Sequence, residues 1–203
     1  MFHVKHEGWE IVRPLGLELD QGQLDKLEAF EVLIRERAIP LGMVASTDAA
    51  RLRERHVQDS LRAATVVTAS DRTAYDLGSG AGLPGVVVAI ARSDLRMALV
   101  ESRRPRAAFL QLVVDRLGLT NTVVSNERVE ALQEPVDLCF SRAFARVDVA
   151  WRVADRLLVP GGRLVYFAGE RFDRSQLPKD AVSTIVTTPA LARSGPLVIM
   201  TRK

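Results

Sequence analysis

Apolar and polar residues follow two different patterns along this chain of 203 residues, one in its first third and one in the remainder. Between Leu24 and Arg37, apolar residues recur every three or four positions with charged residues between them, which predicts an amphipathic helix. A second helix is expected to begin at Thr47 or Asp48, because both residue types cap helix N-termini well. We therefore expect residues 1–70 to form a helical extension.

After residue 70, short apolar runs alternate with helical patterns. The apolar runs predict five strands, at residues 73–78, 96–102, 121–126, 135–144 and 163–169. Helical patterns separate most of them, at residues 83–92, 103–119 and 148–162, and the last is expected to end at Pro160 and the two glycines after it. Two further β-rich runs, joined by a Ser-Gly-Pro turn, predict a closing antiparallel pair within residues 181–203. The alternation predicts an α/β fold for residues 71–203, with a parallel sheet covered on both faces, in one compact unit with the extension.

The composition is that of an ordinary folded domain, with 47% hydrophobic and 26% charged residues. No apolar run is long enough to span a bilayer, and the first ten residues do not resemble a secretory signal. The single cysteine, Cys139, excludes an internal disulfide and fits a reducing compartment. We therefore expect a cytoplasmic protein that has no membrane partner. A monomer is also expected, although none of these features determines the oligomeric state.

Arginine supplies nearly all of the positive charge. Of 28 basic residues, only Lys5, Lys26, Lys179 and Lys203 are lysines, and the formal net charge is +3. Arginine binds phosphate through two parallel hydrogen bonds and stacks on bases, which suits a nucleic-acid partner. A GC-rich genome would give the same preference, so the composition leaves both explanations open.

The most informative stretch is the glycine-rich run YDLGSGAGLPG, from Tyr75 to Gly85, which follows the first predicted strand. Ligands of open parallel sheets lie beyond the carboxyl ends of the strands, so this loop is the expected binding site. Residues 80–85 match G-x-G-x-x-G, the dinucleotide fingerprint. The acid Asp76, followed by G-x-G-x-G at Gly78, Gly80 and Gly82, resembles motif I of the S-adenosylmethionine methyltransferases.

Three features favour the methyltransferase interpretation. Asp76 stands where a dinucleotide-binding fold usually has an apolar residue. The run LLVPGGRLVYF, at residues 157–167, resembles the link that precedes the fifth methyltransferase strand. The antiparallel C-terminal strands also fit a class I, Rossmann-like methyltransferase sheet better than a plain dinucleotide-binding sheet.

The next two strand ends offer further cofactor contacts. Glu101 ends the second strand, where a carboxylate can accept hydrogen bonds from two ribose hydroxyls. The loop after the third strand carries Val129 and Glu130, whose backbone could contact an adenine edge. Taken alone, Glu101 could be a solvated acid, and Glu130 could be an acid at a helix N-terminus.

Three motifs together resemble one enzyme family. They are DLGSGAGLPG, RHVQDS at residues 55–60 and SRAFA at residues 141–145, and they resemble the small-subunit rRNA guanine-N7 methyltransferases, also called glucose-inhibited division protein B or RsmG. The resemblance covers roughly residues 51–169 and is poor before residue 50. It implies transfer of a methyl group from S-adenosylmethionine to N7 of one guanosine in 16S rRNA, free or within the small subunit. It also implies cofactor contacts from a set of five residues: Gly78, Leu83, Val129, Glu130 and Arg142.

The residues present are consistent with N7 chemistry. Guanine N7 has a free lone pair and no proton, so transfer needs positioning rather than a general base. The Asn/Asp-Pro-Pro-aromatic motif that often serves exocyclic amines is absent after the fourth strand. Cys139, which could be the nucleophile of a C5-pyrimidine enzyme, lies in an apolar run and is better explained as a core residue.

Arg142 and Phe144 lie at the carboxyl end of the fourth predicted strand, where the transferred group should lie. Arg142 could clamp the methionine carboxylate, contact a phosphate or pair with guanine O6, or it could form an ion pair with Asp137 or Asp148. Phe144 could stack on the target base or belong to the core.

Two further groups of residues complete the prediction. His56, Asp59 and Ser60 are expected to border the site without touching the reacting groups, and no metal site is expected because no third ligand is near. Arginines on either side could form an rRNA-binding surface or solvated helix faces. They are Arg51, Arg53, Arg55, Arg103, Arg104, Arg106 and Arg146.

Three other functions remain open from the sequence. A small-molecule methyltransferase would turn over without RNA, and a nicotinamide-dependent reductase would bind NAD. A binding protein that has lost the chemistry would bind cofactor and RNA without transfer.

Overall fold

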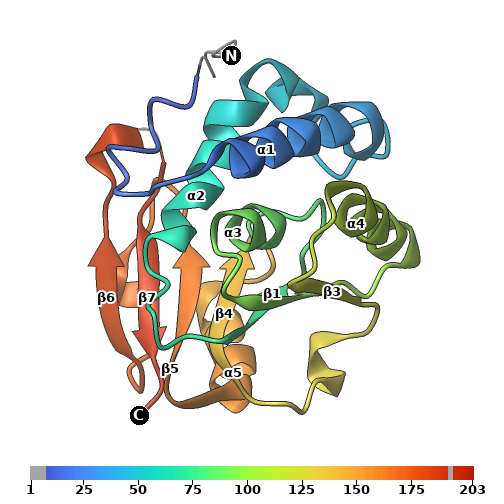
Figure 1. Ribbon diagram of the computed structural model, residues 1–203. Helices are drawn as coiled ribbons and strands as arrows, with labels where there is room; N and C mark the ends of the chain where they lie inside the picture. Colours follow the sequence, from blue (N-terminus) through green and yellow to red (C-terminus); the bar gives the residue numbers. More distant parts are fainter. Residues whose placement is uncertain (1–7, 192–193) are drawn as a thin grey trace.

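A computed structural model describes residues 8–191 and 194–203 and is built around one seven-stranded sheet (Figure 1). The strand order is β3-β2-β1-β4-β5-β7-β6. The strands are β1 (Thr73–Leu77), β2 (Arg96–Val100), β3 (Thr122–Ser125), β4 (Val136–Arg142), β5 (Leu158–Phe167), β6 (Val182–Val186) and β7 (Leu197–Thr201). Neighbours among the first five are parallel, and β7 is antiparallel to both β5 and β6. The predicted α/β fold and its closing antiparallel pair are confirmed.

Helices connect the parallel strands and also precede them. The α-helices are α1 (Gln21–Leu33), α2 (Asp59–Ala64), α3 (Gly85–Ala91), α4 (Arg104–Leu117) and α5 (Val147–Leu157). Shorter helical turns are η1 (Ile34–Ala38), η2 (Ser46–Arg51), η3 (Arg53–Gln58), η4 (Val129–Ala131), η5 (Arg174–Gln176) and η6 (Pro189–Leu191). A capping box at Asp20 starts α1, and Gly118, in the left-handed conformation, ends α4.

The helices cover both faces of the sheet. Helices α1, α2, α3 and α4 gather on one face and α5 lies on the other (Figure 1). Strand β4 shows how the sequence supplies both layers, because Leu138 and Phe140 enter the first hydrophobic cluster while Cys139 enters the second. Such an alternation of wholly apolar positions is expected for a strand that is buried on both sides. No helix within the described residues is long and apolar enough to cross a membrane.

The N-terminal segment packs directly on the rest of the chain. Helix α1 contacts α3 and α4, and its fully buried Phe30 shares one cluster with Leu110 of α4. The predicted second helix is present as a nearly continuous run, but its turns change from 3₁₀ in η2 to π in η3 and to α in α2. The division of the chain at residue 70 stays a prediction, since the hydrophobic cluster includes residues from both sides of it.

Two predicted boundaries are wrong. The second helical run begins at Ser46, with Ala45 at its N-cap position and no side-chain cap, rather than being capped by Thr47 or Asp48. Helix α5 ends at Leu157 rather than at Pro160, and Leu158 already begins strand β5. The residue before a proline is disfavoured in the helical conformation, so Val159 is extended and the chain turns into the sheet early.

Candidate active site: a glycine loop beside an arginine-lined cleft

The glycine loop, residues 78–85, lies where the order of the parallel strands reverses. Strand β1 has β2 on one side and β4 on the other, so the chain winds in opposite directions from it. The loop leaves the carboxyl end of β1 at this point, which is the usual ligand position in open α/β sheets.

The glycines of the loop have different surroundings. A Cβ added at Gly82 would lie 2.6 Å from a methyl group of Val86, and one at Gly78 would lie 2.6 Å from the ring of Phe144. A Cβ at Gly80 would meet nothing closer than 3.8 Å. Gly78 and Gly82 therefore lack side chains because other parts of the protein pack closely against them. Gly80 is the one of these three that has room for a ligand.

Asp76 lies beneath the loop. Its side chain is buried and accepts a hydrogen bond from the backbone N–H of Gly85 at 3.1 Å. Burial raises the pKa of this carboxyl to about 7, although the Gly85 N–H works in the opposite direction. In this structure Asp76 braces the glycine loop from inside, so any effect on a ligand passes through the loop.

Glu101 forms the wall opposite Gly80. It is 5% exposed, and its carboxylate accepts hydrogen bonds from the backbone N–H groups of Gly80 at 3.1 Å and Arg103 at 2.8 Å. The guanidinium of Arg106 lies 4.0 Å from the same carboxylate. The sequence predicts that Glu101 and the glycine loop contact the same ligand. In the structure Glu101 is hydrogen-bonded directly to Gly80 of that loop.

The other predicted cofactor residues lie around this point. Leu83 is partly buried against the core, and Val129 is buried in η4 beside the exposed Glu130. The carbonyl oxygen of Val129 already accepts a hydrogen bond from Arg156 at 2.9 Å. An adenine at this loop would therefore use backbone N–H groups rather than that carbonyl.

A strained turn joins the loop to the second half of the site. Ala143, directly after β4, has a φ of 54°, a region that costs a residue with a side chain about 1–2 kcal/mol. The turn lays the Phe144 ring against Gly78 and leaves Ala143 on the wall of a neighbouring cleft. Strain of this kind is typical of functional sites, and here it sits between the two candidate binding surfaces.

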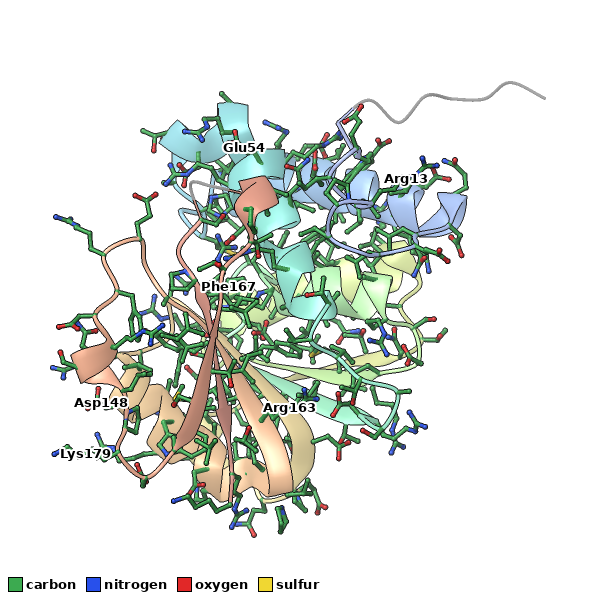
Figure 2. The ribbon with its side chains drawn as sticks, turned by 90° about the vertical axis from the view of Figure 1, so that its left-hand side faces the viewer. Arg13, Glu54, Asp148, Arg163, Phe167 and Lys179 are labelled. Atoms are coloured by element: carbon green, nitrogen blue, oxygen red, sulfur yellow. The ribbon has the colours of Figure 1, made fainter. Side chains whose placement is uncertain are left out.

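The arginine cleft, as we call it, has a volume of about 1190 Å³ and opens beyond the carboxyl ends of β4 and β5. Its wall includes five arginines and three aromatic side chains: Arg51, Arg55, Arg62, Arg142, Arg171, Tyr166, Phe167 and Phe172. Figure 2 shows Glu54 on the helical segment on one side of this region and Phe167 at the end of β5 on the other, and both line the cleft. Planar guanidinium groups and aromatic rings together suit a nucleotide.

Arg142 lies at the boundary between the glycine loop and the arginine cleft. Its side chain is 17% exposed, lies 3.4 Å from a carboxylate oxygen of Asp59 and stands 5.7 Å from the centre of the Phe167 ring. It also donates hydrogen bonds to the carbonyl oxygen of Arg55 at 3.0 Å and to Ser60 Oγ at 3.4 Å. The alternative ion pairs that the sequence suggested are wrong.

Those two alternative partners, Asp137 and Asp148, have other roles in the structure. Asp137 accepts backbone hydrogen bonds from Arg72 and Thr73 at 2.8 and 2.9 Å, and Asp148 pairs with Arg146 at 3.2 Å. Sequence proximity suggested both, whereas the real partner of Arg142 comes from the N-terminal extension.

Of the predicted group His56, Asp59 and Ser60, Asp59 lines the arginine cleft and the other two do not. Asp59 binds the nearly fully buried Arg62 at 2.6 Å, and Arg62 donates to the carbonyl oxygen of Gly195 at 2.8 Å. His56 contacts Asp48 rather than Asp59, with 2.9 Å between Nε2 and Oδ2. The prediction therefore found the right helix but missed Asp48 and Arg62.

The predicted arginine surface divides into separate groups. Arg51 and Arg55 line the arginine cleft. Arg103, Arg104 and Arg106 lie at the start of α4 near the glycine loop, and Arg146 is highly exposed at the start of α5. Arg53 turns away toward α1, where it lies 2.8 Å from Glu31 and 4.7 Å from the centre of the Trp9 ring.

The structure also bears on two chemical alternatives, a cysteine nucleophile and a bound metal ion. Cys139 is fully buried, and burial raises the pKa of its thiol, so it does not supply a thiolate to the cleft. Among the residues that the structure describes, no group of three His, Cys, Asp or Glu side chains is arranged to hold a metal ion.

Comparisons with known proteins agree with this geometry. A family model described as GidB, rRNA small subunit methyltransferase G, matches residues 23–188. The ribosomal RNA small subunit methyltransferase G of Ralstonia nicotianae is 37% identical over 202 residues, which covers 93% of this chain and 91% of the relative. The protein of the same name from Acidiphilium cryptum is 40% identical over 149 residues, covering 72% of this chain and 69% of the relative.

Solved structures share the fold at low identity. The O-methyltransferase TomG from Streptomyces achromogenes, in complex with SAM, superposes with a TM-score of 0.59 at 16% identity and covers 92% of each chain. The family model spans most of the chain, from α1 to the C-terminal strands, and the Ralstonia relative matches nearly end to end. The chain is therefore a member of the rRNA small subunit methyltransferase G family.

Proposed function

We propose that this protein transfers the methyl group of S-adenosylmethionine to N7 of one guanosine in small-subunit rRNA. Membership of the family supports an enzyme that methylates this RNA. The observation that carries the proposal is the shared boundary at residues 142–144. On one side lies a loop suited to a nucleoside cofactor, and on the other lies a cleft suited to a nucleotide.

The cofactor would lie across the carboxyl ends of β1 and β2. Glu101 would accept hydrogen bonds from both ribose hydroxyls, and Gly80 would let the cofactor approach the backbone. The loop that carries Val129 and Glu130 would contact the adenine. The sulfonium group would then point toward Arg142 and Phe144, where the arginine cleft begins.

The residues at this boundary suit transfer to a ring nitrogen. N7 of guanine needs no proton removed, so the enzyme has only to hold the lone pair in line with the methyl group. Arg142 is held within hydrogen-bond distance of several fixed acceptors and could orient either the methionine carboxylate or guanine O6. Phe144 would limit the space between the two substrates.

The arginine cleft would receive the RNA. Three acids, Glu54, Asp59 and Glu170, stand among its five arginines, so the wall keeps a surplus of positive charge. Phosphate contacts of this kind weaken steeply as salt rises. A substrate bound to ribosomes is cytoplasmic, and we propose that location together with a monomeric enzyme.

The test uses S-adenosylmethionine carrying a labelled methyl group. The protein is incubated with small ribosomal subunits and, separately, with naked small-subunit rRNA, both from a strain that lacks the gene. The labelled RNA is then reduced and cleaved with aniline, which cuts at N7-methylguanosine. We expect one cleavage site, with one of the two substrates preferred.

Other outcomes would contradict the proposal in distinct ways. Label without aniline cleavage would retain an rRNA methyltransferase and overturn the N7 assignment. Turnover that does not depend on RNA would favour a small-molecule methyltransferase. Binding of NAD in place of S-adenosylhomocysteine would favour the reductase.

A further inference from the structure

Three side chains form a hydrogen-bonded chain that leads from the N-terminal extension to the active-site boundary. Asp48 Oδ2 lies 2.9 Å from His56 Nε2, and His56 Nδ1 lies 3.0 Å from a terminal nitrogen of Arg142. Asp48 and His56 are mostly buried, with 14% and 17% of their side chains exposed. A histidine therefore bridges a carboxylate and the guanidinium group on which both halves of the site meet.

The chemistry of the partners fixes the state of His56. A guanidinium has only donors, so Nδ1 of His56 must offer its lone pair to Arg142. The ring proton then sits on Nε2 and is donated to the carboxylate of Asp48. If Nδ1 also carried a proton, an N–H group of His56 would face an N–H group of Arg142 with no acceptor between them. Two positive charges would then lie within 3.0 Å of each other.

The charges that surround His56 act in opposite directions. Asp48 at η2 favours the protonated ring, whereas Arg55 on η3 and Arg142 on β4 oppose it. Burial is the largest influence, followed by Arg142, and together they lower the pKa of His56 below its ordinary value. The ring is therefore neutral near pH 7, as the hydrogen bond to Arg142 requires.

The charges around Arg142 come from further elements. Asp59 and Arg62 on α2 and the buried Asp76 on β1 all face its guanidinium. Asp59 is shared with Arg62, which it binds at the shorter distance of 2.6 Å. The orientation of the Arg142 guanidinium group therefore depends on its other hydrogen-bond acceptors, among them His56 and the carbonyl oxygen of Arg55.

We propose that Asp48 and His56 are positioning residues for methyl transfer, with Asp48 keeping His56 in the tautomer whose free Nδ1 holds Arg142 at the boundary between the glycine loop and the arginine cleft. The inference rests on the proposed function, because Arg142 is assigned there to the reacting groups. It gives the N-terminal extension a role in the chemistry. Protonation of His56 would release Arg142, so transfer would fail on the acid side.

The kinetic test compares three variants with the wild type across pH 5 to 9. His56→Asn puts an amide oxygen near the place of Nδ1 and cannot titrate. Asp48→Asn removes the carboxylate that selects the tautomer. Asp71→Asn is the matched control, because Asp71 is also mostly buried and ion-paired, with Arg163, but lies before β1 at the other end of the sheet.

The expected results differ between the variants. In the wild type, kcat should fall with acid with an apparent pKa below about 6.5, the ordinary value for histidine. His56→Asn should abolish that acid limb, and Asp48→Asn should lower kcat about tenfold, the effect of one lost hydrogen bond, with an unchanged KM for S-adenosylmethionine. Asp71→Asn should lower the melting temperature and leave the pH profile unchanged. Burial raises the pKa of Asp76 to about 7 in all of these variants, so the proposal is overturned if the separate limb below about 6.5 persists in His56→Asn.

A second measurement needs no activity. An NMR titration of the His56 ring should show the Nε2–H tautomer and a pKa that rises in Arg142→Ala, since a neighbouring positive charge is removed. An Nδ1–H tautomer, or a pKa that Arg142→Ala leaves unchanged, would overturn the proposal. If the wild type failed to methylate small subunits, the proposed function would fail, and the titration would still decide whether Asp48 and His56 hold Arg142.

Discussion

The two halves of the proposed active site, the glycine loop for the cofactor and the arginine cleft for the RNA, are built in opposite ways. The cofactor half is local, because Asp76, the glycine loop and Glu101 lie within 26 residues of sequence and on two neighbouring strands. The arginine cleft collects its wall from Ile11, from residues 51–62, from the end of β4, from residues 166–176 and from residues 190, 191, 194 and 195. The cofactor half is therefore encoded by one continuous stretch of sequence, whereas the arginine cleft forms only when distant segments pack together.

The difference also appears in how side chains are held. In the cofactor half, backbone N–H groups bind carboxylates, so Gly80 and Gly85 are tied to Glu101 and Asp76. In the cleft half, side chains bind side chains across long separations, as Arg142 does with Asp59. Backbone contacts tolerate few substitutions in the loop itself, whereas a side-chain network can be altered one member at a time.

The largest expected effect is on folding and comes from the glycine loop. Gly82→Ala would place a methyl group 2.6 Å from Val86 at a φ of 87°. Overpacking and the left-handed backbone together should lower the free energy of unfolding by about 2–5 kcal/mol. Gly80→Ala is the matched control, because it has a positive φ but open space around the new Cβ, and it should fold and bind cofactor weakly. Equal melting temperatures for the two variants would contradict this division of roles.

The second effect is on transfer. Arg142→Ala should reduce kcat/KM for small subunits about 100-fold, the size expected when a group that orients the reactants is lost. Arg163→Ala is the control, because the side chain of Arg163 has a similar exposure of 20% and is also ion-paired. Arg163 lies on β5, away from the end of that strand where Phe167 borders the cleft (Figure 2). It should lose stability and keep its specific activity. If both variants lost activity only in proportion to their unfolded fraction, Arg142 would be structural.

The third effect is on cofactor affinity. Glu101→Gln should weaken binding of S-adenosylhomocysteine about tenfold or more, because charged hydrogen bonds to two hydroxyls become neutral ones. Calorimetry measures this directly. Glu31→Gln is the control, since Glu31 is equally buried and charge-paired but lies on α1. Unchanged affinity in Glu101→Gln would remove Glu101 from the cofactor site.

The smallest effect is on RNA binding. Arg171→Ala, on the wall of the cleft, should weaken binding of small-subunit RNA several-fold and reduce the slope of log affinity against log salt by about one. Arg152→Ala removes an exposed arginine from α5 on the other face and should change neither quantity. Titrations at several salt concentrations would show the difference, and equal slopes for all three proteins would contradict the cleft as the RNA site.

The same comparison explains how far the sequence can be interpreted. Alternating apolar runs define the sheet, and the loop motif follows β1 directly, so the sequence alone is enough to place the glycine loop and Glu101 at the same edge of the sheet. The hydrogen bond between Gly80 and Glu101 is seen only in the structure. The position of Arg142 at a strand end marks it as a candidate site residue. Its partner Asp59 does not lie at a strand end, and their contact depends on where α2, which packs on α3, lies relative to the end of β4.

Other parts of the cleft carry no local signal. Arg62 is nearly fully buried and binds Gly195, far along the chain, and the spacing of residues in α2 does not show this. Arg53 belongs to the same arginine-rich helix as Arg51 and Arg55 but turns toward Trp9, because successive residues of a helix point in different directions. Packing between distant segments, rather than local propensity, decides these positions.

The most direct test is a crystal structure with S-adenosylhomocysteine and guanosine monophosphate bound together. We expect the ribose hydroxyls at Glu101, the adenine beside Val129 and the cofactor sulfur facing Arg142, with guanine N7 approaching it from the arginine cleft. A nucleotide in the cleft and a cofactor on the glycine loop, separated only by residues 142–144, would support a single transfer site. A cofactor that lies in the arginine cleft itself, or a guanine whose N7 points away from the sulfur, would contradict it.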